Sequence, residues 1–253
     1  MFSHRHQHWA YVWIPLVTSF VWFGMLWAML ITWLAQGRPK YVSQQGKIAY
    51  ISDIGASFLK PLFIAGGAVT GVGFFLSLSV ERLLRYTGRL PPSLRKREQV
   101  FSYLAILGSL AGAVGLICLA VFDTQRHKKL HRAFLLLFML GVAFSAIFTI
   151  VEYHWISRDF REFQRLKIAY IAKAVITTIL ICLAIAFGVA LYRSHNTGAI
   201  LEWTVAFLFT FYLLTFYYDL RQTKHFRKHG YFKDIIRAEK QRRAEKHHTM
   251  RQI

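Results

Sequence analysis

Side chains that could do chemistry gather in two stretches of this chain, each of which follows or precedes an apolar run. The octapeptide YISDIGAS at 50–57 holds a tyrosine, two serines and an aspartate. A second stretch holds Asp123, His127 and His131 at intervals of four residues, which would share one face if a helix ran through them. Carboxylates and imidazoles together can ligate a metal ion or act as acid and base toward a substrate.

Two readings of these polar residues stay open. A metal or acid–base site needs helical geometry from Asp123 to His131, but this stretch is predicted to cross a loop, and His127 lies in a basic turn (RHKK, 126–129). The second reading is a polar cluster that closes one mouth of a helix bundle, with His195 and Glu202 contributed from the same side. We favour the cluster and assign no catalytic residue, metal or cofactor.

The composition places these residues in a membrane protein. Hydrophobic residues make up 55% of the 253 positions, and charged residues only 17%. A helix of about 20 apolar residues crosses a hydrocarbon core of about 30 Å, and in lipid the backbone must satisfy its own hydrogen bonds. We therefore predict an all-α, polytopic membrane protein, a bundle of six transmembrane helices, with spans near residues 11–34, 62–80, 100–122, 133–151, 168–191 and 201–218.

The distribution of basic residues predicts the orientation of the bundle. An even number of spans puts both termini on one side, and that side carries 22 Lys and Arg residues against nine on the other. Loops rich in Lys and Arg stay in the cytoplasm. We expect both termini to be cytoplasmic and YISDIGAS to face the extracellular or lumenal side. The chain then divides into a membrane domain at 1–222 and a basic cytoplasmic tail at 223–253.

Polar and small residues within the spans predict how the helices pack. Pairs of small residues four apart, such as Gly67 with Gly71 and Gly108 with Gly112, allow close backbone approach inside the bundle, which we favour over a homodimer contact. Glu152 and Lys173 lie near the cytoplasmic ends of their spans, and we expect them to form a structural ion pair. With no further ionisable residue expected deeper in the spans, a channel or pump is disfavoured.

Three segments resemble one known family. The last span reads ILEWTVAFLFTFYLLTFYYDL at 200–220, span four begins with HRAF at 131–134, and YISDIGAS lies in the first outer loop. Together they are similar to the DRAM/Frag/Sfk family of six-span proteins, the damage-regulated autophagy modulators and their relatives, with a CWH-type N-terminal domain. Where some members have proline and glutamate after the loop motif, this chain has FLKP at 58–61. The resemblance carries over to Tyr50, Ser52, Asp53, Gly55, His131, Glu202, Trp203 and Asp219.

The loop motif has a local structural interpretation. We expect Asp53 to accept backbone N–H groups in a tight turn, and Gly55 to adopt a positive φ where the chain reverses toward the second span. If this loop folds back onto the helices, Asp53 meets the region of His131 and Glu202. YISDIGAS would then act as a structural plug with lipid headgroup contacts.

The cytoplasmic side is strongly basic. The net charge of +20 could indicate nucleic-acid binding, but the basic residues lie beside spans, so anionic lipid headgroups of the inner leaflet are the expected partners. In the tail, Tyr231, Phe232, Ile235 and Ile236 would share one helical face, which is typical of a segment lying on a membrane. The predicted anionic-lipid contacts are Arg95, Lys96, Arg97, Arg221, Lys224, Arg227, Lys228, Lys233, Arg237, Lys240, Arg242 and Arg243.

Two functional hypotheses follow from the residues and the resemblance. The first is a non-enzymatic membrane protein that organises lipid homeostasis or signalling through its basic face, together with a peripheral lipid kinase or scaffold. The resemblance implies phosphoinositide and lipid homeostasis at the plasma membrane, our expected location, or autophagy at an endomembrane such as the vacuole, lysosome, ER or Golgi. The alternative is a lipid-remodelling enzyme at the outer face that acts on a GPI-type or other lipid, with Asp53, His131 and Glu202 as its acid–base groups.

Overall fold

The computed structural model describes residues 7–90, 95–159 and 164–221. Within these residues it contains six long helices, as the sequence predicts, one short helix in the loop where a tight turn was expected, and no strand. The helices are α1 (Gln7–Ala35), α2 (Ile51–Gly55), α3 (Lys60–Tyr86), α4 (Lys96–Val121), α5 (Lys128–Asp159), α6 (Gln164–Arg193) and α7 (His195–Arg221).

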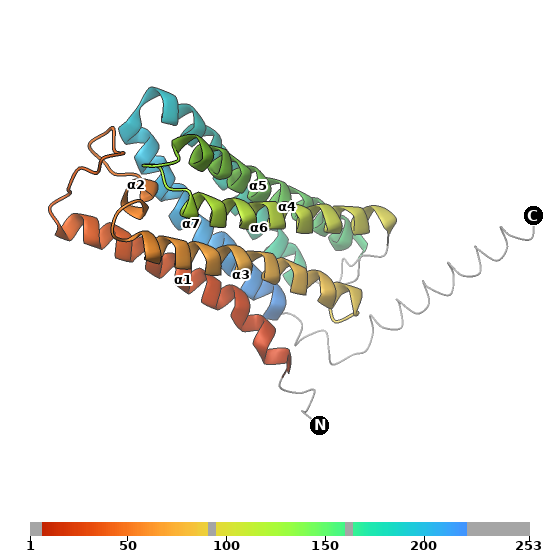
Figure 1. Ribbon diagram of the computed structural model, residues 1–253. Coiled ribbons are helices and arrows are strands. Elements are labelled where there is room, and N and C mark those ends of the chain that lie inside the picture. The colour runs from red at the N-terminus through yellow and green to blue at the C-terminus, as the bar shows by residue number, and fades with distance from the viewer. Residues whose placement is uncertain (1–6, 91–94, 160–163, 222–253) are drawn as a thin grey trace, which may run out of the picture.

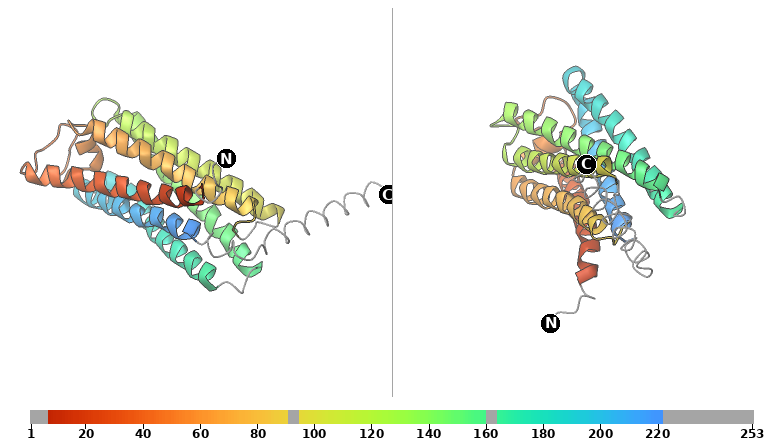
Figure 2. Two further views of the ribbon diagram at one scale, coloured as in Figure 1. Left: turned by 90° about the horizontal axis from the view of Figure 1, so that it is seen from below. Right: turned by 90° about the vertical axis from the view of Figure 1, so that its right-hand side faces the viewer.

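The six long helices lie side by side as one antiparallel bundle (Figure 1). Each packs against its neighbours in a ring, in which α1 lies between α3 and α7, α4 lies between α3 and α5, and α6 lies between α5 and α7. Contact around this ring is sparsest between α5 and α6. Helix α1 begins and α7 ends at the same end of the bundle, which we call the terminal end, and α2 lies at the opposite end, the α2 end (Figures 1 and 2).

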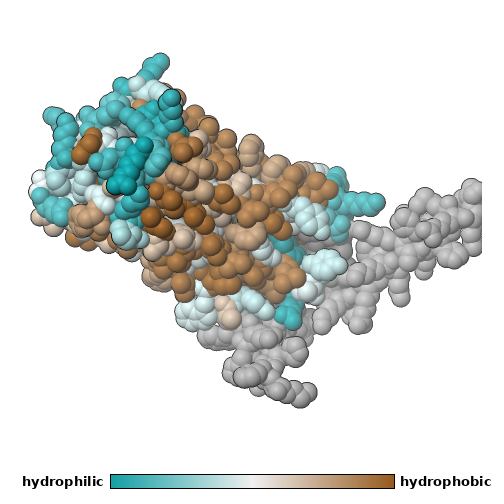
Figure 3. Space-filling model, in the orientation of Figure 1, coloured by the Kyte–Doolittle hydropathy of each residue, from teal (hydrophilic) through white to brown (hydrophobic). Residues whose placement is uncertain are grey.

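All six long helices are long and apolar enough to cross a membrane. Figure 3 shows the corresponding surface, an apolar band along the bundle with hydrophilic residues crowded at the α2 end. The helices extend beyond the predicted spans because polar residues continue them: α3, for example, runs from Lys60 to Tyr86. It stops there because Gly88 adopts φ +70° and the N–H of Arg89 turns back to the carbonyl of Leu84 at 2.8 Å.

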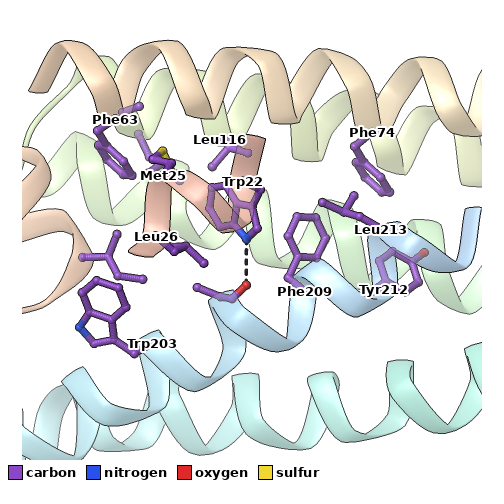
Figure 4. Packing of buried hydrophobic residues seen from close by; sticks show 14 of the residues in the cluster. Trp22, Met25, Leu26, Phe63, Phe74, Leu116, Trp203, Phe209, Tyr212 and Leu213 are labelled. Carbon is purple, nitrogen blue, oxygen red and sulfur yellow. Dashed lines mark hydrogen bonds between the residues drawn. The ribbon is translucent and has the colours of Figure 1, made fainter. Parts of the chain in front are cut away.

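Aromatic residues fill the centre of the bundle and join α1, α3 and α7. Trp22 of α1 donates its indole N–H to the backbone carbonyl of Ala206 on α7 at 2.8 Å, which satisfies a polar group that lipid could not (Figure 4). The ring of Phe209 packs edge-on against Trp22 and Phe74 with centroids 5.9 Å apart. The α1–α3–α7 side is therefore a densely packed core, whereas α5 and α6 meet more loosely.

Small residues bring α3, α4 and α5 into close contact, as the sequence predicts. A methyl group on Gly71 would lie 3.0 Å from the carbonyl oxygen of Ala113 on α4. Gly108 and Gly112 of α4 face Gly141 of α5, and a methyl group on Gly141 would overlap the backbone of both. Gly108, Gly112 and Gly141 thus form a contact between helices inside the bundle. In lipid the hydrophobic effect does not drive helices together, so close packing of this kind must stabilise their association.

We expect the substitution Gly141→Ala to destabilise the bundle, because the added methyl group can be accommodated only if α4 and α5 move apart. Overpacking of this kind costs about 1–3 kcal/mol. The matched control is Gly188→Ala on α6, where the methyl group would meet nothing within 4 Å. The measurement is the thermal midpoint in detergent, followed by size-exclusion chromatography. An unchanged midpoint for Gly141→Ala would contradict this description of the α4–α5 contact.

Candidate functional site

A polar cavity of about 290 Å³ lies at the α2 end of the bundle. It is lined by residues from the loop before α2, from α2, from the α4–α5 connection, and from α5, α6 and α7. Five residues of the predicted cluster line it: Tyr50, Ser52, Asp53, His131 and Glu202. The structure therefore brings together residues separated by up to 152 positions in the sequence, as expected if YISDIGAS folds back onto the helices.

Two carboxylates hold the YISDIGAS segment in place. Asp53 accepts the backbone N–H of Tyr50 at 3.1 Å and the hydroxyl of Ser43 at 2.5 Å, so its carboxylate accepts a backbone N–H as predicted, at the start of a short helix instead of in a tight turn. Glu202 of α7 accepts the backbone N–H of Ile51 at 2.6 Å. These N–H groups at the start of α2 have no helical partner of their own, so the carboxylates supply the acceptors that they need.

Three further contacts tie the loop to α7. Trp203 donates its indole N–H to the carbonyl of Ala49 at 3.0 Å. The side-chain oxygen of Asn196 accepts the N–H of Lys47 at 2.6 Å. Gly198 lies directly under the ring of Tyr50, where any side chain would meet the phenol oxygen. The loop is thus positioned by the first two turns of α7, and of these contacts the sequence reasoning missed Asn196 and Gly198.

The prediction for Gly55 was wrong. Among the described glycines only Gly37 and Gly88 have a positive φ, and Gly55 is the last residue of the short helix α2. Its lack of a side chain matters for a different reason: a methyl group at Gly55 would lie 2.5 Å from the ring of Phe63 on α3. Gly55 therefore allows α2 to pack against α3, instead of allowing the chain to turn.

His131 is buried on the inner side of α5 and is fixed by the end of α4. Its Nδ1 lies 2.8 Å from the carbonyl oxygen of Leu119 and 3.0 Å from that of Phe122. Carbonyl oxygens only accept hydrogen bonds, so Nδ1 carries a hydrogen, and Nε2 of the neutral ring is left with the lone pair. The imidazole thus closes the end of α4, whose last carbonyl groups lack helical partners.

Asp123 and His127 do not join His131 in a metal site. Asp123 forms an ion pair with Lys60 at 2.5 Å and accepts the N–H of Arg126 at 2.7 Å. His127 is exposed and stacks edge-on against Phe122. Within residues 7–90, 95–159 and 164–221, no group of three or more potential ligands could hold a metal ion. The lysine of FLKP, Lys60, thus joins the start of α3 to the α4–α5 connection through its ion pair with Asp123.

The electrostatics of the loop follow from burial. Burial raises the pKa of the Asp53 carboxyl, against the effect of its bonds from Ser43 and Tyr50. Burial and the nearby charge of Glu202 raise the pKa of Tyr50 to about 12, which keeps its phenol protonated. For Asp123, burial alone would raise the pKa, but the hydrogen bonds from Lys60 and Arg126 outweigh it and lower the pKa. Asp123 is therefore a firmly ionised partner of Lys60 at neutral pH.

A second, apolar cavity of about 110 Å³ lies deeper in the bundle, next to the polar cavity. Three residues line both: Leu135 of α5, Phe187 of α6 and Glu202 of α7. Below them the walls are almost entirely hydrophobic, with residues such as Met139, Val142, Leu180 and Ala184. It lies between α5, α6 and α7, on the side of the ring where helix contact is sparsest.

The terminal end holds a network of buried charges, and its pairing corrects one prediction. Lys173 of α6 does not serve as the partner of Glu152: it pairs with Asp219 of α7 at 2.5 Å, while Glu152 of α5 pairs with Arg82 of α3. Lys173 and Asp219 lie on the neighbouring helices α6 and α7, whereas Arg82 and Glu152 join α3 to α5, which flank α4 in the ring. An ammonium or carboxylate in the hydrocarbon region requires such a partner.

Three members of this network were missed by the sequence reasoning, which placed Arg82 and Arg85 in a cytoplasmic loop. Both are buried on α3 with Glu81. Glu81 accepts hydrogen bonds from Arg85 at 2.9 Å and from the phenol of Tyr153 on α5 at 2.6 Å. The signal was present: Glu81 and Arg85 are spaced four apart, as on one helical face, directly after an apolar run.

The predicted lipid-binding residues are only partly described. Arg95, Lys96, Arg97 and Arg221 lie exposed at the terminal end, where Arg97 stacks over the ring of Trp155 at 4.1 Å from its centroid. The remaining predicted contacts, from Lys224 to Arg243, fall outside the described residues, as does the predicted tail helix.

The sequence matches known proteins along most of its length. The family described as the Frag1/DRAM/Sfk1/Cwh43P N-terminal domain matches residues 10–223. Protein sfk1 of Schizosaccharomyces pombe is 32% identical over 220 residues, which cover 86% of this chain and 66% of that protein. Protein SFK1 of Saccharomyces cerevisiae is 25% identical over 90% of this chain and 82% of its own length. The human DNA damage-regulated autophagy modulator protein 1 is 29% identical over 48% of this chain and 56% of its own. No solved structure matches.

The buried pair Lys173–Asp219 generates a stability prediction. Either Lys173→Met or Asp219→Leu leaves one buried charge without its partner, which costs about 3–5 kcal/mol in proteins. Replacing both residues together removes both charges, so most of the loss should be recovered. The measurement is the thermal midpoint of purified protein in detergent. Single variants as stable as the unmodified chain, or a double variant no better than the worse single one, would contradict the pairing.

Proposed function

Because this chain belongs to the Frag1/DRAM/Sfk1/Cwh43P N-terminal domain family, we propose that it is a non-enzymatic multi-pass membrane protein that organises membrane lipid homeostasis or signalling. It does so by holding a membrane lipid at the α2 end and by binding anionic lipids at the basic terminal end. The proposed location is the plasma membrane, with the terminal end in the cytoplasm.

One observation carries this proposal: a polar cavity and an apolar cavity share part of their walls in the bundle of membrane-length helices. A lipid needs both, a polar pocket for its headgroup at the membrane surface and an apolar pocket for a chain below it. The shared residues Leu135, Phe187 and Glu202 lie within about two turns of the ends of their helices at the α2 end.

The basic terminal end supports the second half of the proposal. Arg95, Lys96 and Arg97 are exposed at the start of α4 and Arg221 at the end of α7, and the sequence carries ten further Lys and Arg residues from 224 to 251. Each basic residue near an anionic leaflet contributes about 1 kcal/mol to binding. The same surface would receive a peripheral lipid kinase or a scaffold protein as its partner.

The enzymatic alternative, remodelling of a lipid by Asp53, His131 and Glu202, fits this geometry less well. An acid–base group must be free to exchange a proton with the substrate. The carboxylates of Asp53 and Glu202 instead accept backbone N–H groups of the α2 segment, and Nδ1 of His131 is engaged by two carbonyls, so that of these three groups only Nε2 of His131 keeps a lone pair for a proton. These contacts suit anchoring groups, and we therefore keep the non-enzymatic proposal. The relative named as an autophagy modulator makes autophagy one setting for such a role.

Filling the apolar cavity should displace the bound lipid. In the variant Ala184→Trp an indole occupies the space between α5 and α6, and we expect at least a ten-fold loss of lipid that co-purifies with the chain. Ala186→Trp is the matched control, since Ala186 lies on the exposed face of the same helix. The measurement is mass spectrometry of lipid extracted from protein purified in mild detergent. Equal lipid content in both variants would refute lipid binding in the cavity.

The basic tail should approach an anionic membrane. A fluorophore attached at the carboxyl end of the full chain, reconstituted in vesicles, should transfer energy to a bilayer dye when phosphatidylserine is present. Added salt should reduce the transfer, because screening weakens surface electrostatics. Replacing Lys240, Arg242 and Arg243 by Gln should reduce it as well. Transfer that is equal in neutral vesicles and insensitive to salt would remove this half of the proposal.

A further inference from the structure

The polar cavity indicates which class of lipid it takes. We propose that it binds the phosphodiester of a glycerophospholipid, with Lys128 and Arg132 against the phosphate and an acyl chain in the apolar cavity between α5 and α6. This inference rests on the proposed function, which requires a bound lipid but leaves its headgroup open.

The charged residues that line the polar cavity differ in the hydrogen bonds they already make. Lys128 and Arg132 are four residues apart on α5, so they share one helical face, and both line the cavity. Among the residues that the structure describes, no hydrogen bond or ion pair involves either side chain, although Lys128 acts electrostatically on Asp53 and Arg132 on Tyr50. The cavity carboxylates, by contrast, already accept hydrogen bonds from the backbone of the α2 segment. The donor groups left for a ligand are therefore those of the two cations.

The chemistry of these two cations favours a phosphate as their ligand. A guanidinium binds phosphate oxygens through two parallel hydrogen bonds, and an ammonium adds a compact point charge. His195 of α7 lines the same cavity from the opposite side and offers a further ring nitrogen. An uncharged headgroup, such as that of a diacylglycerol, would leave both cations unused.

The cavity-lining residues of α5 extend over a distance that matches one phospholipid. Going down the helix from Arg132, the residues that line the cavities include Leu135, Met139 and Val142, which lie three, seven and ten positions further on. At 1.5 Å per residue the distance from Arg132 to Val142 is about 15 Å, half of the ~30 Å hydrocarbon core. The basic pair and the apolar wall below it therefore match the headgroup and one leaflet's depth of a single phospholipid.

The source of the phosphate is the bilayer. The apolar cavity borders α5 and α6, the neighbours with the sparsest mutual contact in the ring, and we place the entry of the acyl chain from the surrounding hydrocarbon between them. A soluble phosphate compound would have no use for this cavity. With the orientation that the basic residues predict, the bound phospholipid belongs to the outer or lumenal leaflet.

The test uses the purified full chain in mixed micelles that contain dioleoylphosphatidylcholine and dioleoylglycerol in equal amounts. These lipids share their chains and differ in the phosphodiester headgroup. After repurification, mass spectrometry gives the ratio of the two bound lipids. We expect the unmodified chain to prefer the phospholipid. In the variant Lys128→Gln/Arg132→Gln, the ratio of bound phospholipid to bound dioleoylglycerol should fall at least ten-fold.

The matched control is Arg126→Gln/Lys129→Gln, which removes the same charge from the same turn at exposed residues that do not line the cavity. It should keep the full preference. If both double variants lose it equally, the effect is general surface charge and the phosphate site is refuted. If Lys128→Gln/Arg132→Gln keeps the preference, the phosphate site is refuted as well.

Two further arms separate this inference from the proposed function. If Ala184→Trp loses both lipids while Lys128→Gln/Arg132→Gln keeps the original ratio, lipid binding stands and only the headgroup assignment fails. If the unmodified chain retains neither lipid, both proposals fail. Soluble glycerophosphocholine at millimolar concentration should leave the bound phospholipid in place, and complete displacement would show that the ligand is a free phosphoester instead of a lipid.

Discussion

Buried ion pairs at the terminal end are the constraint on which the bundle depends. Hydrocarbon cannot solvate a charge, so Lys173 must find Asp219, and Arg82 must find Glu152, before their helices can lie in the membrane. The first pair joins α6 to α7, and the second joins α3 to α5. Tyr153 connects the two through its bond to Glu81 and through the ammonium of Lys173, which lies 5.4 Å from its ring centroid. These contacts connect the helices of the ring at the terminal end, which compensates for the sparse direct contact between α5 and α6.

The opposite end is organised by a different polar requirement. There the chain between α1 and α3 must satisfy its backbone groups without a sheet or a long helix, and side chains of α7 provide several of the partners. Glu202 and Trp203 bond the backbone of this segment, and Asn196 accepts two of its N–H groups. Glu202 also lines both cavities. The residue that anchors the loop is therefore also the residue at which the polar cavity meets the apolar one, so a ligand there would contact the loop anchor directly.

The contrast between the two ends gives the molecule a tight half and an open half. Glycines bring α4 and α5 to backbone contact, and aromatic residues fill the space among α1, α3 and α7. Near the α2 end, Phe187 of α6 belongs to a small hydrophobic cluster with Leu135 and Met139 of α5, and the apolar cavity lies beside these residues. A protein that must only span a membrane could fill this space with larger side chains than Ala143, Ala146 and Ala184. Small residues at these positions keep it available.

The sequence by itself determined the number of membrane helices, their approximate bounds, the close contacts of Gly108, Gly112 and Gly141, and the capping role of Asp53. These follow from local rules, since helix length, small-residue spacing and turn chemistry all act between near neighbours in the chain. Only the tertiary structure decided that Lys173 pairs with Asp219, that Arg82 and Arg85 are buried, that Gly55 makes room for Phe63, and that a cavity remains between α5 and α6. Each of these depends on which helix lies beside which and at what rotation, and residues 46 or 70 positions apart carry no periodic signal that could report it.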